Sequence, residues 1–139
     1  MAPFVLDASV ALSFVCDDEF SPYSDAIAET LKRGHAVVPV VWPPEITNAI
    51  PTDVRRGSIP EMDAPLQIGS MGRLRVTIDR GIAPEFLAQT TLTVGLAHRL
   101  SAYDAGYLEL AMRRGLPLAT QDERLLRAAG AAGVEILQP

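Results

Sequence analysis

Short apolar runs alternate with longer helical patterns along most of this chain, and that alternation restricts the possible folds more than any other feature. The predicted strands are residues 4–6, 36–42, 75–78, 116–120 and 134–137. Helical patterns lie at residues 8–15, 21–33, 43–50, 84–99, 101–114 and 122–130, with a weaker one at 60–68. Strands that follow one another through helices form parallel sheets covered on both faces. We therefore predict an α/β fold: one domain over residues 1–139, a three-layer α/β/α sandwich whose mainly parallel central sheet has about five strands.

Prolines and glycines interrupt this pattern. Pro39 falls inside the predicted strand 36–42 and indicates an edge or a bulge, because proline lacks the N–H that a central strand donates. Pro51 removes a helix donor and clashes one turn back, so the helix that begins near Pro43 is predicted to bend or stop there. Residues 51–84 hold several more prolines and glycines and are the least regular part of the chain.

The charge balance argues against a bare basic surface for nucleic acid. The formal net charge is −5, with 48% apolar and 21% charged residues, which is ordinary for a globular protein. A polyanion would have to be held by a local basic patch, by bound cations, or by both. The candidate phosphate contacts are the arginine pairs Arg55 with Arg56, Arg73 with Arg75, and Arg113 with Arg114. The last pair equally suits a helix C-terminus.

Several sequence features argue against a secreted, membrane-spanning or disulfide-rich protein. The first residues have no basic leader, and no apolar run approaches the ~20 residues of a membrane span, so we expect a soluble, cytoplasmic protein with no membrane partner. Cys16 is the only cysteine, which excludes a disulfide framework and suits a reducing cytosol. His35 and His98 lie in unrelated contexts and are interpreted as surface residues.

Four carboxylates stand where helices are predicted to begin. Asp7 follows the first strand, Glu45 lies in the first turn of the helix after the second strand, and Asp122 follows the strand 116–120. Asp104 completes Ser101-x-x-Asp104, close to a capping box, and apolar residues crowd around it. Taken singly, each has a structural explanation as a cap or as a favourable charge at a helix N-terminus.

The position that the four carboxylates share in the predicted fold is more informative than any one of them. All four map to helix N-termini on the side of the sheet where ligands of parallel α/β folds bind. If they converge, their mutual repulsion must be relieved by protonation or by a cation. Hard oxygen ligands select Mg²⁺ or Mn²⁺, and no His or Cys cluster indicates zinc. A carboxylate-bound metal of this kind is suited to phosphodiester hydrolysis.

The same residues carry a resemblance to a known family. The chain resembles the PIN domain of VapC-type toxins of bacterial toxin–antitoxin systems, in the stretches "FVLDASV", "VVPVVWPPEITNAI", "GLAHRLSAYDAGYLELAMRRGLPLATQDERL" and "AAGVEIL". The likeness runs nearly end to end and keeps motif order and spacing. Two departures are Pro44, where the family usually has leucine, and the Pro51-Thr52 pair, where the family continues a helix. Residues 51–80 are usually a helical pair that serves dimer and antitoxin contacts.

The resemblance implies a PIN-like domain over residues 1–139 and a Mg²⁺- or Mn²⁺-dependent endoribonuclease. It implies an RNA substrate (tRNA or another structured RNA), a homodimer, and a VapB-type antitoxin that neutralises the enzyme. The acidic catalytic cluster would be Asp7, Glu45, Asp104 and Asp122. Asp7 and Asp104 would be the principal metal ligands, while Asp122 and Glu45 would hold the metal directly or through water. The residues that orient them would be Ser9, Asn48 and Thr120.

Three other readings were weighed. An Asp-nucleophile phosphotransferase usually needs a second Asp two residues after the first, and here that residue is Ser9. A phospho-receiver module requires a lysine late in its sequence, but the only lysine here is Lys32, near the start of the chain. The remaining alternative is a PIN-like module that binds RNA or a protein without cutting, which the irregular residues 51–84 favour and the four filled acidic positions oppose.

Overall fold

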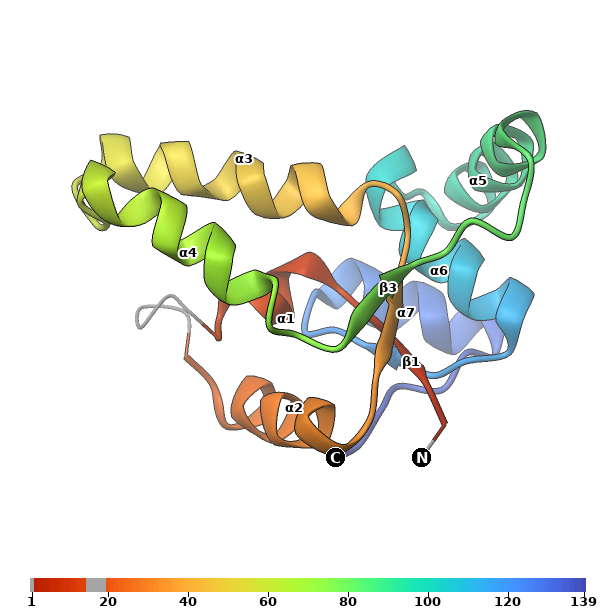
Figure 1. Ribbon diagram of the computed structural model, residues 1–139. Helices are drawn as coiled ribbons and strands as arrows, with labels where there is room; N and C mark the ends of the chain where they lie inside the picture. The colour runs from red at the N-terminus through yellow and green to blue at the C-terminus, as the bar shows by residue number, and fades with distance from the viewer. Residues whose placement is uncertain (1, 15–19) are drawn as a thin grey trace.

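The computed structural model of the protein describes residues 2–14 and 20–139 (Figure 1). Its centre is a four-stranded parallel sheet in the order β3-β2-β1-β4, with β1 at Phe4–Leu6, β2 at Ala36–Val38, β3 at Val76–Ile78 and β4 at Leu118–Ala119. In register, Val5 pairs with Val37 on one side and with Leu118 on the other. Every residue of β1, β2 and β4 is buried, as expected of strands covered on both faces.

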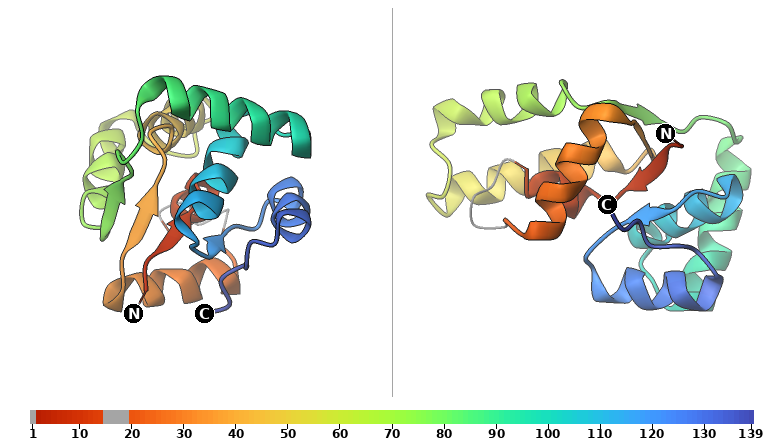
Figure 2. Two further views of the ribbon diagram at one scale, coloured as in Figure 1. Left: turned by 90° about the vertical axis from the view of Figure 1, so that its right-hand side faces the viewer. Right: turned by 90° about the horizontal axis from the view of Figure 1, so that it is seen from below.

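Helices flank the sheet and complete the α/β/α layers (Figures 1 and 2). They are α1 at Ala8–Leu12, α2 at Pro22–Arg33, α3 at Trp42–Arg55, α4 at Ala64–Met71, α5 at Pro84–His98, α6 at Ala102–Arg114 and α7 at Glu123–Ala132. A short 3-10 helix, η2, covers Glu61–Asp63 and leads into α4. The predicted fold class is therefore confirmed, and the weak helical pattern at 60–68 corresponds to η2 and most of α4.

Helix α6 is the central helix of the molecule. Residues 105–111 are all buried, and the helix contacts β1, β4, α5 and α7. Its first turn begins at the cap Ser101, whose hydroxyl accepts a hydrogen bond from the Asp104 amide at 3.2 Å. Because α6 packs against β1, its N-terminal turn is fixed relative to the carboxyl ends of the strands.

The sheet has four strands rather than about five. Residues 134–137 run beside β4 but form only an isolated parallel bridge between Ile136 and Leu118. The Leu118 amide donates to Glu135 O and the Leu137 amide to Leu118 O, both at 2.9 Å. With β4 only two residues long, the predicted last strand finds too few partner groups to extend the ladder.

Neither interrupting proline has the effect predicted from the sequence: β2 is an internal strand rather than an edge, and α3 does not stop at Pro51. Strand β2 ends at Val38 rather than at Trp42, because the chain turns at Pro39, whose carbonyl accepts a hydrogen bond from the Trp42 amide at 3.0 Å. Helix α3 does not stop at Pro51 but continues to Arg55. Pro51 is on the exposed side of α3, while Ile50 is buried, so tertiary packing holds the helix together despite the missing hydrogen bond.

Three smaller expectations complete the comparison with the sequence. The first helix, α1, ends at Leu12, and Val15 and the lone Cys16 lie outside the described residues. His35 and His98 are half-buried rather than fully on the surface. Among the described residues, no helix has both the length and the apolar character that a membrane crossing requires.

Candidate acidic site

Asp7 is a buried carboxylate fixed by two hydroxyl groups. It is 5% exposed and caps the N-terminus of α1, directly after β1. The hydroxyls of Ser9 and Thr120 both donate to its Oδ2, at 2.8 and 2.7 Å. Burial raises the pKa of Asp7, the bonds from Thr120 and Ser9 lower it, and the charge of Asp104 raises it again. Asp7 is thus a rigidly held carboxylate for which the charged form is unfavourable.

Thr120 connects Asp7 to the start of α7. Its hydroxyl, 2% exposed, donates to Asp7 and accepts a hydrogen bond from the Asp122 amide at 3.1 Å. Asp122 caps α7, with its Oδ1 accepting from the amides of Arg124 at 2.9 Å and Leu125 at 3.0 Å. The structural interpretation of Asp122 as a cap therefore holds, and its carboxylate is also exposed to solvent.

Glu45 has the largest carboxylate pKa shift in the site. It lies half-buried in the first turn of α3, and burial together with the charges of Asp7 and Asp104 raises its pKa from an ordinary 4.5 to about 7. Glu45 Oε1 is buried and has no hydrogen-bond partner among the described residues. The Tyr107 hydroxyl lies near enough to lower the Glu45 pKa slightly, but the two groups do not meet hydrogen-bonding geometry. Glu45 Oε1 and the Tyr107 hydroxyl are therefore both buried without a hydrogen-bond partner among the described residues.

Asp104 occupies the first turn of α6, where its amide, rather than its carboxylate, takes part in the capping interaction with Ser101. Burial and the charge of Asp122 raise the pKa of Asp104, while the hydrogen bond with Ser101 and the charge of Arg124 lower it. Ser101 therefore interacts with both the amide and the carboxylate of Asp104, and Asp104 also lines a cavity between α3 and α6.

A cavity of about 560 Å³ separates the N-terminal turns of α3 and α6. Glu45 and Asn48 line it from α3, and Tyr103 and Asp104 line it from α6. Asn48 lies on the same side of α3 as Glu45, but within the described part of the chain its side chain makes no hydrogen bond to Glu45. Asp7 and Asp122 do not line the cavity. Their charges act on two residues that do: Asp7 raises the pKa of Glu45, and Asp122 raises the pKa of Asp104.

The four carboxylates are therefore linked by a chain of electrostatic interactions. Asp7 and Asp104 each raise the pKa of Glu45, and Asp122 raises that of Asp104. Their donors are hard oxygens, which suit Mg²⁺ or Mn²⁺ in chemical type. Nevertheless, across residues 2–14 and 20–139, no three His, Cys, Asp or Glu side chains stand in an arrangement that would hold a metal ion. The fit to a metal thus rests on donor type, charge and the unpartnered Glu45 oxygen.

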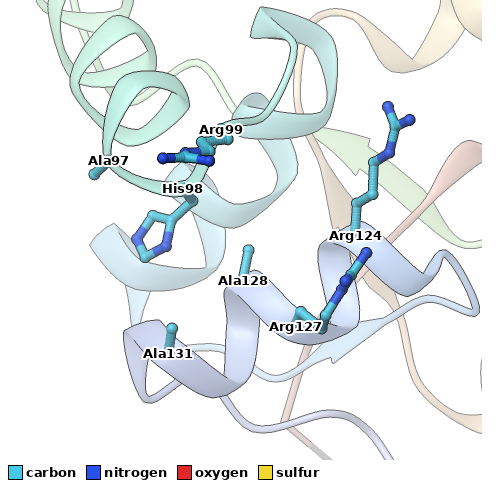
Figure 3. Close-up of a pocket in the computed structure, with 7 residues that line it drawn as sticks. All are labelled: Ala97, His98, Arg99, Arg124, Arg127, Ala128 and Ala131. Carbon is cyan, nitrogen blue, oxygen red and sulfur yellow. The ribbon is translucent and has the colours of Figure 1, made fainter.

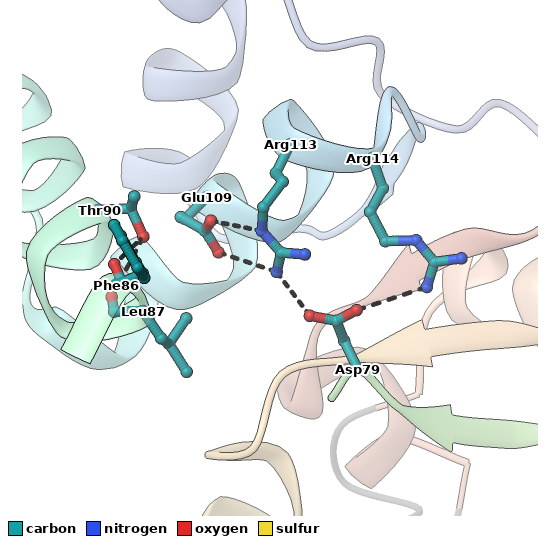
Figure 4. Close-up of polar contacts among 7 residues, drawn as sticks. All are labelled: Asp79, Phe86, Leu87, Thr90, Glu109, Arg113 and Arg114. Carbon is teal, nitrogen blue, oxygen red and sulfur yellow. Dashed lines mark hydrogen bonds and ion pairs between the residues drawn. The ribbon is translucent and has the colours of Figure 1, made fainter. Parts of the chain in front are cut away.

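A second group of carboxylates was missed by the sequence analysis. Asp79, directly after β3, and Glu109, in α6, are 8% and 4% exposed at the side chain. Arg113 bonds both of them, at 2.5 Å to Asp79 Oδ2 and 2.7 Å to Glu109 Oε1, and Arg114 approaches Asp79 at 3.6 Å (Figure 4). The hydrogen bonds from Arg113 raise its own pKa. Arg113 and Arg114 are therefore engaged within the fold, which supports their structural reading over a phosphate contact.

Comparisons with known proteins bear on the fold. No model of a known protein family matches the chain, and no curated protein is significantly similar to it. The fold places the chain among α/β/α sandwich proteins with a parallel sheet. Within that class, the crystal structure of PAE2754 from Pyrobaculum aerophilum is similar to it, with a TM-score of 0.68 over 91% of this chain and 84% of that chain, at 22% sequence identity. A likeness at this identity carries the fold alone.

Proposed function

We propose that this protein is a metal-dependent endoribonuclease of the PIN-domain, VapC-type toxin class, which cleaves RNA phosphodiester bonds. The observation that carries the proposal is the set of four carboxylates whose charges oppose one another at the carboxyl ends of the strands. Within the described residues, no arginine or lysine forms an ion pair with any of them. An acidic site without an ion-pair partner is stabilised by a bound cation. The motif resemblance of the sequence supports the same assignment.

Asp7, Asp104 and Asp122 are the residues that would hold Mg²⁺ or Mn²⁺, with Glu45 contributing directly or through water. When bound, such an ion lowers the pKa of a coordinated water and neutralises charge that develops on the scissile phosphate. The protein contributes rigidity: Ser9 and Thr120 restrict the Asp7 carboxylate through two hydrogen bonds to the same oxygen. Such restraint fixes the orientation of a ligand before it binds.

Glu45 supplies proton chemistry at the cavity wall. With a pKa of about 7, its carboxyl group is divided between charged and neutral forms near neutral pH. A group of this kind can accept or release a proton at its unpartnered Oε1 without a large energetic penalty. Glu45 lines the cavity of about 560 Å³, although its Oε1 atom is itself buried.

The alternative, a PIN-like module that binds RNA or a protein without cutting, drew on the irregular residues 51–84. In the structure this region contains the end of α3, the helix α4 and strand β3, and α3 contacts α4. Pro51 and Pro65 lie within α3 and α4, and Pro60 caps η2, so these prolines do not interrupt the described elements. The alternative now differs from the proposal only in whether the acidic site reacts.

The first experiment is a cleavage assay with purified protein, mixed tRNA and other structured RNA, in Mg²⁺ or Mn²⁺ and in EDTA. We expect cleavage that requires metal and is lost in Asp104→Asn. Asp25→Asn is the control: Asp25, like Asp104, is an acid in the first turn of its helix, but Asp25 is exposed and Asp104 is half-buried. Wild-type cleavage by Asp104→Asn, or no cleavage by a folded wild type, would remove the nuclease assignment.

The proposal extends to partners. A homodimer is expected by the motif resemblance, and light scattering of the purified chain measures its mass directly. A VapB-type antitoxin is expected to abolish cleavage at equimolar ratio. A monomeric, active enzyme would refute the dimer but leave the reaction assignment in place.

A further inference from the structure

A second cavity, of about 430 Å³, lies between the end of α5 and the helix α7 (Figure 3). His98 and Arg99 reach it from the end of α5, and Arg124 and Arg127 reach it from α7. The rest of the lining is alanine, at positions 97, 128 and 131. These small side chains leave the space between the two helices to the basic groups.

Among the described residues, no carboxylate forms an ion pair with the arginines of this cavity. Within residues 2–14 and 20–139, Arg99, Arg124 and Arg127 form no ion pair, in contrast to Arg113 and Arg114. The chain as a whole carries a formal charge of −5, so three unpaired guanidinium groups around one cavity are not explained by its overall composition. Guanidinium groups present paired N–H donors that match the oxygens of a phosphate.

The backbone at Arg99 gives a second, independent observation. Helices α5, α6 and α7 all end in a left-handed residue, and α6 and α7 use Gly115 and Gly133 for this purpose. Helix α5 instead uses Arg99, with φ of 54°, the only non-glycine residue with positive φ in the described part of the chain. A non-glycine residue is uncommon in this conformation and carries some backbone strain there. The strained residue is one of the arginines of the cavity.

The cavity adjoins the acidic site. Arg124 lies in the first turn of α7, and its amide donates a hydrogen bond to Oδ1 of the cap Asp122 at 2.9 Å. A chain of phosphates lying in the basic cavity would therefore continue toward the carboxylates. This adjacency favours a nucleic-acid strand over an isolated anion, because a strand presents successive phosphates to both sites.

We propose that the cavity lined by Arg99, Arg124, Arg127 and His98 binds backbone phosphates of the RNA strand, beside the nucleotide that is cut. The proposal rests on the ribonuclease function proposed above. Arg99 and Arg127 are positioning residues: they hold the strand in register and take no part in the reaction at the carboxylates. The basic cavity thereby supplies the local positive patch that the acidic chain needs to hold a polyanion.

The test measures binding without cleavage, by fluorescence anisotropy of a fluorescein-labelled single-stranded RNA in EDTA. We expect Arg99→Gly and Arg127→Gln each to weaken binding about tenfold and to lower the slope of log affinity against log salt by about 0.7. Arg33→Gln removes an exposed arginine at the end of α2 and is expected to bind as wild type does. Arg99→Gly also separates binding from folding, because glycine suits the left-handed position and the Tm should not fall.

Each result decides the question. Unchanged RNA affinity in Arg99→Gly and Arg127→Gln, or no binding by the wild type, would overturn the phosphate site. Loss of affinity for a polyglutamate peptide but not for RNA would overturn it in favour of an acidic protein partner. A wild type that binds RNA through these arginines but never cuts it with Mg²⁺ or Mn²⁺ would support the phosphate site and defeat the nuclease assignment. The two proposals therefore fail separately.

Discussion

The molecule contains two groups of carboxylates near the carboxyl ends of its parallel strands, and they are treated in opposite ways. Asp79 and Glu109 are neutralised by Arg113, with Arg114 close to Asp79. The group around Asp7 has no such partner among the described residues, and its members raise one another's pKa. Burial alone therefore does not separate the two groups; an ion pair with an internal arginine does.

The difference has an energetic meaning. A buried carboxylate paired with a guanidinium recovers much of its desolvation penalty, and removing one partner then leaves a costly isolated charge. A buried carboxylate without a partner already carries that penalty in the folded protein. We therefore expect the two groups to respond oppositely to neutralising substitutions: the paired group should lose stability, and the unpaired group should lose activity but not stability.

The largest expected contrast is between Asp7→Asn and Asp79→Asn. Asp7→Asn should lower metal-dependent cleavage by more than about 100-fold, because a proposed ligand is lost. Its Tm should not fall, since asparagine also caps helices and the unfavourable buried charge is gone. Asp79→Asn should keep its cleavage rate and lower the Tm. Rates of RNA cleavage and thermal unfolding of both variants measure this; full activity in Asp7→Asn would abolish the contrast.

The paired group can be tested directly with Arg113→Ala. This change leaves Glu109 and Asp79 buried without their cation and should destabilise the fold by about 3 kcal/mol. Denaturant unfolding measures the loss. Arg33→Ala, an exposed arginine also in the last turn of its helix, is the matched control and should stay within about 0.5 kcal/mol of wild type. A similarly small change in Arg113→Ala would mean that the ion pairs contribute little.

The sequence could predict the fold because its signals are local and repeated. Apolar runs and caps such as Ser21 and Ser101 locate the elements, and alternation gives the parallel sheet. The failures lie where long-range packing decides. Helix α3 continues past Pro51 because Ile46 and Ile50 are buried, and a local rule cannot include that contribution.

The sequence could indicate the four acids of the candidate site, but it could not indicate which carboxylates of the molecule would lack an arginine partner. Asp79 follows a strand just as Asp7 does, and nothing local separates the two. The distinction depends on Arg113, which is 34 positions further along the chain, and on Thr120, which is 113 positions from Asp7. The basic cavity was missed for the same reason: its arginines come from the end of α5 and from α7, and neither sequence pattern indicates that the two line one cavity.

A bound metal ion should stabilise the folded protein only through the carboxylates that have no arginine partner. A ligand that binds the folded state alone adds about 1.4 kcal/mol to the free energy of unfolding at ten times its Kd. We therefore expect Mg²⁺ or Mn²⁺ to raise the Tm of wild type and of Asp79→Asn, but not that of Asp7→Asn. Thermal melts across a metal titration measure this. An equal rise in Asp7→Asn would show that the cation binds elsewhere.

The smallest expected effect is a pH dependence that belongs to Glu45. Its pKa is about 7 in the folded protein and 4.5 ordinarily, so between these values the folded state retains a proton that the unfolded chain releases. Raising the pH through this window should therefore destabilise the protein, by about 1 kcal/mol after allowance for solvent screening of a half-buried side chain. Glu45→Gln should remove that loss, whereas Glu85→Gln, at an exposed first-turn position of α5, should not. Denaturant unfolding at about pH 5 and about pH 8 measures the difference. If Glu45→Gln and wild type lost equal stability over this range, Glu45 would share the behaviour of the paired carboxylates, and the division between the two groups would no longer include it.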